Sequence, residues 1–240
     1  MELKKRDCPI EIEILPRGAG WTDISWFVPE QMPEPLILKA SDIGYNIGDF
    51  ARALYYLSPN QPELGGDGAK VEIVWYEYDS TTGRYGKMHR QGESLTPGGS
   101  YVMLPIKAEF FFDEEPGGSE WILSRNPPAE PNNDNDFPVH VHIKLDRYRY
   151  GYDCGYELDF DFKYSDLCYA VSKAFTKAIK KYGFYGYLHS ASDSIDILNL
   201  IFLKAIALGN SDAYELNYHK NKNSANSNFR KEIELLVFDM

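Results

Sequence analysis

Hydrophobic and polar residues alternate along much of the chain, which predicts a protein built mainly of β-strands. In the segment 8–15, for example, Ile10, Ile12 and Ile14 alternate with two glutamates. Glycine and proline pairs separate many of the segments, as they do in an antiparallel meander. The predicted strands are 8–15, 23–28, 70–79, 85–90, 101–113, 121–124, 139–147, 156–164 and a closing strand over 229–238.

Three segments have the periodicity of helices instead. A short early helix is expected over 49–57, where apolar residues fall on one face. A longer helix is predicted over 165–182, with its lysines mostly on the outer face and Gly183 at its end. The third helix, over 194–208, is the most hydrophobic part of the chain.

The helix 194–208 is expected to lie in the core. After its capping serine, its only polar residues are Asp196, Asn199 and Lys204, so more than half of its circumference is apolar. Its apolar run is too short and too interrupted to cross a bilayer. We therefore expect protein to pack against it on several sides.

Strands outnumber helices, and the longer helices come late in the chain. This order indicates an α+β fold with mainly antiparallel sheet rather than a doubly wound parallel sheet. A chain of 240 residues is compatible with a single domain. The segment 126–138, rich in proline and asparagine, is the place where the chain could divide in two.

Charge narrows the functions that the chain could have. It carries 36 acidic and 25 basic residues, a net charge of −11. A nucleic-acid-binding surface needs clustered lysine and arginine, so nucleic acid is not expected as a partner. An excess of negative charge attracts cationic partners over a distance.

The cysteines and the N-terminal residues bear on location. Cys8, Cys154 and Cys168 form no CxxC pair and are odd in number, so neither a zinc ribbon nor a disulfide framework is indicated. The first fifteen residues include no unbroken apolar stretch like that of a signal peptide. A cytoplasmic protein that does not enter a membrane is therefore expected.

Residues 139–164 predict a β-hairpin with a specific register. If Gly151 and Tyr152 form a two-residue type II′ turn, one face of the hairpin is apolar and the other is charged. The expected pairs are Val141–Phe162, Ile143–Phe160 and Leu145–Leu158 on the apolar face, and His140–Lys163, His142–Asp161 and Lys144–Asp159 on the charged face.

The charged face of this hairpin has two functional interpretations. His140 and His142 project from the same strand face, and with Asp161 they could bind a metal ion. Alternatively, the face is a docking surface for a cationic partner, formed by an acidic stripe and tyrosines near the turn. The residues predicted to bind the partner are Asp153, Glu157, Asp159, Asp161, Tyr150 and Tyr152. The simplest interpretation of both patterns is a solvated strand face with cross-strand charge pairs.

No catalytic motif emerges from the chain. The glycine pairs are not followed by the lysine of a P-loop, and neither GxSxG nor HExxH occurs, so no catalytic residue and no cofactor are predicted. The favoured hypothesis is a non-enzymatic protein that masks a basic partner, such as a toxin domain, by analogy with immunity proteins. The alternatives are a metal-dependent hydrolase that uses the two histidines, and a structural subunit of a larger assembly.

Overall fold

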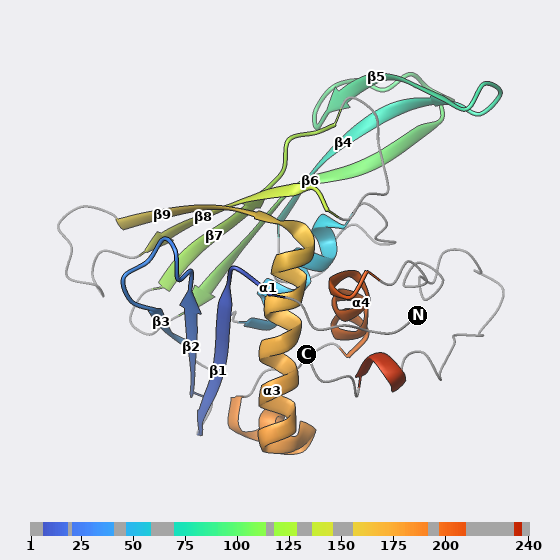
Figure 1. The fold of residues 1–240 in the computed structure, drawn as a ribbon. Coiled ribbons are helices and arrows are strands. Elements are labelled where there is room, and N and C mark those ends of the chain that lie inside the picture. Colours follow the sequence, from blue (N-terminus) through green and yellow to red (C-terminus); the bar gives the residue numbers. More distant parts are fainter. Residues whose placement is uncertain are drawn as a thin grey trace.

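The structure, a computed structural model, describes residues 7–18, 21–40, 47–58, 70–113, 118–128, 136–145, 156–191, 197–209 and 233–236. Two antiparallel sheets and the helices that cover them give an α+β fold, as predicted (Figure 1). The strands are β1 (Glu11–Gly18), β2 (Trp21–Phe27), β3 (Leu36–Ala40), β4 (Lys70–Asp79), β5 (Arg84–Arg90), β6 (Tyr101–Asp113), β7 (Gly118–Ser124), β8 (Pro138–Leu145) and β9 (Tyr156–Lys163). The helices are α1 (Ile47–Leu57), α3 (Tyr164–Ala191) and α4 (Ile197–Ala207), with a further helical turn at 233–236.

The two sheets differ in size and in position. The smaller sheet has the order β1-β2-β3, and the larger has the order β5-β4-β6-β7-β8-β9. In Figure 1 the far ends of β4, β5 and β6 extend away from the helices, whereas β7, β8 and β9 lie above the small sheet. The strand β9 is therefore at one edge of the large sheet, beside the main core.

The main core forms where the small sheet faces the large one. Trp26 of β2 is buried, and its ring centroid lies between 5.1 and 6.3 Å from those of Phe50, Trp121, Phe160 and Phe162. These partners come from α1, β7 and β9, because alternation along each strand directs every second side chain inward. Residues on both sides of the segment 126–138 belong to this same cluster.

The helices complete the main core. Tyr164, at the start of α3, donates a hydrogen bond from its hydroxyl to the carbonyl of Leu54 in α1 at 2.6 Å. Residues 200–208 of α4 and the turn after it are buried, as its sequence predicted. Lys204 is buried with them, and its Nζ donates to the carbonyl oxygen of Leu236 at 3.1 Å.

Three local predictions differ from the structure. The predicted closing strand over 229–238 is wrong, because residues 233–236 are helical and Leu235 packs into the core. The predicted helix 165–182 ends at Gly183 as expected, because the φ of 72° at this residue is not helical, but a further helical segment that was not predicted follows it through Ala191 within α3. The strand β3 was not predicted, because its five residues follow a proline-rich loop and are too few to show a period.

None of the helices in the described ranges is long and apolar enough to cross a membrane.

Replacing Tyr164 by Phe is expected to lower the free energy of unfolding by about 1–2 kcal/mol, because the Leu54 carbonyl loses a buried donor. Chemical denaturation of the purified protein measures this change. Tyr85→Phe is the matched control: its hydroxyl makes no hydrogen bond within the described part of the chain, so a change below about 0.5 kcal/mol is expected. Equal stability of Tyr164→Phe and the control would contradict the role of this bond in joining α3 to α1.

Candidate functional site

The predicted hairpin is present as β8 and β9, but its register differs by two residues from the prediction. Val141 lies opposite Phe160 instead of Phe162, and His142 lies opposite Asp159 instead of Asp161. A shift of two residues leaves each side chain on its own face, so hydrophobic alternation cannot detect it. Turn geometry sets the register, and the proposed turn residues lie outside the described part of the chain.

The two faces of the hairpin are as different as the sequence predicted. The inward side chains are buried in the main core: Val139, Val141, Ile143, Phe160 and Phe162. On the outward face of β9, the side chains of Glu157, Asp159 and Asp161 are 51%, 56% and 80% exposed. Three of the predicted partner-binding residues therefore form one solvent-facing row, which we call the acidic row.

Two histidines of β8 connect to this row in a ladder. His140 Nδ1 is 3.0 Å from Asp161 Oδ1, and its Nε2 is 3.1 Å from Asp159 Oδ1. His142 Nδ1 is 2.8 Å from the same Asp159 oxygen. A ring nitrogen donates only when it carries a proton, so both contacts of His140 are hydrogen bonds at once only in the imidazolium form.

Asp159 is the centre of the ladder, a position that the predicted register did not give it. The hydrogen bond from His142 is the largest cause that lowers the pKa of Asp159 below its ordinary value of 3.8. Loss of hydration, the second-largest cause, acts in the opposite direction, whereas the charges of His142 and His140 and a hydrogen bond from His140 lower the pKa further. This carboxylate consequently remains negatively charged throughout the physiological pH range.

The metal-binding interpretation required His140, His142 and Asp161 to converge on one point. In the structure Asp161 bonds to His140, and it is Asp159 that contacts both imidazoles. Across the described ranges, no group of three or more His, Cys, Asp or Glu side chains is arranged to hold a metal ion. The geometry is that of direct histidine–carboxylate hydrogen bonds.

The position of β9 makes the acidic row accessible. No other strand of the described chain pairs with its outer side, so its outward backbone groups form a free sheet edge. Tyr150, Tyr152 and Asp153, the remaining predicted contact residues, lie outside the described residues. Comparison with family models, curated proteins and solved structures found no match.

A second polar cluster, which the sequence did not indicate, lies at the far ends of β4 and β5. His89 is buried on β5, with its Nε2 2.8 Å from Glu77 Oε1 of β4. This bond is the largest cause that lowers the pKa of Glu77. Nδ1 of His89 lies 3.5 Å from Glu93 without forming a hydrogen bond. The pair depends on the register between the adjacent strands β4 and β5, which shifts between Tyr76 and Tyr78 and which the sequence pattern did not predict.

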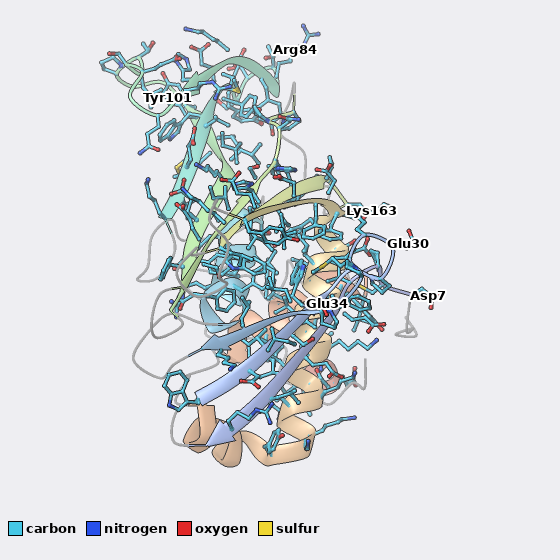
Figure 2. All side chains as sticks on the ribbon, turned by 90° about the vertical axis from the view of Figure 1, so that its left-hand side faces the viewer. Asp7, Glu30, Glu34, Arg84, Tyr101 and Lys163 are labelled. Atoms are coloured by element: carbon cyan, nitrogen blue, oxygen red, sulfur yellow. The ribbon has the colours of Figure 1, made fainter. Side chains whose placement is uncertain are left out.

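The open cleft beside this cluster has a volume of about 620 Å³ and includes Glu77, Asp79, Arg84 and Tyr101. Its carboxylates already hold the hairpin together: Asp79 accepts hydrogen bonds from Thr81 N at 2.8 Å and from the Thr82 hydroxyl at 2.7 Å. Figure 2 shows Arg84 and Tyr101 at one end of the molecule, far from Lys163 of β9. The cleft is therefore separate from the acidic row, and its polar groups serve the hairpin structure.

Replacing His142 by Ala is expected to raise the pKa of Asp159 toward 3.8, because the largest cause of its depression is removed. Since folding lowers this pKa, the interaction stabilises the folded protein fully above the ordinary carboxylate value and is lost as pH falls through the folded value. Carbon-detected NMR titration of the side-chain carboxyl measures the midpoint. Lys144→Ala is the control and should leave the midpoint unchanged; an unchanged midpoint in His142→Ala would contradict the ladder.

Proposed function

We propose that the chain is a non-enzymatic binding protein whose acidic row on β9 binds a basic protein partner. The observation that carries the proposal is the presence of Glu157, Asp159 and Asp161 in one exposed row on an edge strand. Their strand is anchored on its other face by Phe160 and Phe162 in the main core. A rigid backing of this kind lets charged side chains meet a partner without ordering a loop first.

The distribution of charge supports a basic partner. Across the sheet, the neighbours of the acidic row on β8 are His140, His142 and Lys144, so the carboxylates concentrate at the edge. The whole chain adds a net charge of −11. Long-range attraction would therefore speed the approach of a cationic protein, and the local row would orient it.

The protonation of the row favours binding over acid–base catalysis. A general base works best when its pKa is raised toward the operating pH and its site excludes water. Asp159 instead has a lowered pKa and an exposed side chain. A permanent, hydrated negative charge suits recognition of lysine and arginine.

Immunity proteins that neutralise cationic toxin domains are one class with this design, and a toxin domain in the cytoplasm is the kind of partner that we infer. The assignment to this class is an analogy based on charge and on an accessible edge strand. It accounts for the features of the chain without an active site.

Reversing Glu157 and Asp161 to lysine is expected to weaken binding of the basic partner about tenfold or more, mainly by slowing association. The experiment uses the tagged full chain to recover its partner from the native host at low salt, and then measures association rates with the purified pair. Affinity should also fall as salt concentration rises.

The matched control reverses Glu13 and Glu93, which are exposed on β1 and after β5 and give the same change in net charge. Loss of binding in the acidic-row variant alone supports the site. Equal loss of binding in both variants would show that only the net charge of the chain matters. Unchanged binding in the acidic-row variant would rule out this face as the docking surface.

A further inference from the structure

A small pocket opens beside the acidic row, where β4, β6, β7, β8 and β9 lie side by side. Its volume is about 300 Å³. The charged and titratable residues that line it are Glu72, Arg90, Lys107, Arg125, His140 and Asp161. Four of these six side chains are basic, in contrast to the chain as a whole.

Arg125 is the exceptional residue of this pocket. It is only 7% exposed, and its Nε and Nη1 atoms are shielded from solvent and have no hydrogen-bond partner among the residues that the structure describes. Its backbone N–H is bonded to the carbonyl of Ile106 at 2.8 Å, which fixes the chain at the end of β7. Its guanidinium lies 4.0 Å from the ring centroid of Phe137, which in turn stacks on Tyr164.

Burying a cation without a carboxylate partner destabilises the folded protein, because the contact with the aromatic ring replaces only part of the hydration that the cation loses. Loss of hydration lowers the pKa of Arg125 from 12.5 to about 10, so the group is still charged at neutral pH. Asp161 is hydrogen-bonded to His140 instead, and no ion pair joins Glu72 to Arg125 among the described residues. A guanidinium held in this state is prepared for an oxyanion from outside the chain.

We propose that this pocket binds a small carboxylate-bearing molecule, with the guanidinium of Arg125 as the group that anchors its carboxylate. One feature favours a carboxylate over a phosphate. The pocket also contains Glu72 and Asp161, which repel a dianion more strongly than a monoanion. The same two acids can accept hydrogen bonds from an ammonium group, so an amino acid fits the pocket better than a dicarboxylate. The pocket shares Asp161 with the acidic row, but its anchor, Arg125, is not part of that row.

The opposing explanation is that Arg125 is only a packing residue held over Phe137. The two explanations differ in the effect of Arg125→Met, which keeps an unbranched side chain over the ring and removes the charge. If the guanidinium is kept unpaired in order to bind a ligand, Arg125→Met without ligand should be as stable as the wild type or more stable. If the cation–π contact is its purpose, the variant should melt at a lower temperature.

The direct test is an NMR titration of the full-length protein that follows the Arg125 side-chain Nε–H signal. The probes are 4-aminobutyrate, succinate and inorganic phosphate, each compared with sodium chloride at equal ionic strength. We expect a saturable shift of this signal with 4-aminobutyrate, a weaker response to succinate and phosphate, and none with chloride. The melting temperature of the wild type should rise with 4-aminobutyrate.

Two variants complete the test. Arg125→Met should lose the ligand-dependent rise in melting temperature, and Arg125→Lys should reduce it, because lysine keeps the charge but lacks the planar donor group. Arg17→Met, which removes an exposed arginine paired with Asp23, is the control and should respond as the wild type does. A chloride response equal to that of the probes, an undiminished response in Arg125→Met, or binding of phosphate but not of carboxylates would overturn the proposal.

Discussion

The contact between Trp26 and the aromatic residues of the large sheet is the interaction on which the rest of the structure depends. Trp26 meets Trp121 edge-on, with ring centroids 5.1 Å apart, and it also contacts Phe160 and Phe162 of β9. Aromatic pairs of this kind add about 0.5–1.5 kcal/mol each beyond the burial of their surface. They hold the small sheet against one face of the large sheet.

This contact determines which way the edge strand faces. Because Phe160 and Phe162 are buried in the core, the alternation of side chains along the strand places Asp159 and Asp161 on the opposite face. The acidic row is therefore a consequence of core packing, and it cannot turn inward without exposing two phenylalanines. The histidines of β8 lie opposite these carboxylates. Their contacts lower the pKa of Asp159, which keeps this member of the row charged.

Two buried cations of this fold differ in whether their charged groups have a hydrogen-bond partner. Lys204 in α4 is completely buried, but its Nζ reaches the carbonyl of Leu236 and so joins the core helix to the end of the described chain. Arg125 is almost as deeply buried, yet two of its nitrogens have no partner. The first is a cation with a structural partner; the second is the feature that we interpret as a ligand anchor. An unpaired buried charge is expected where function requires it, because stability alone would favour an apolar residue.

The sequence by itself determined the fold class, most strand positions, the burial of α4 and the two faces of the β8–β9 hairpin. Each of these features depends on the local periodicity of hydrophobic residues, which is visible in a single sequence. Only the tertiary structure decided the register that makes Asp159 the centre of the ladder, because a shift by two residues preserves every face. It also decided the helical form of 233–236, the pairing of His89 with Glu77 and the isolation of Arg125. These features arise from the register and packing of the folded chain, which bring together partners that local periodicity does not specify.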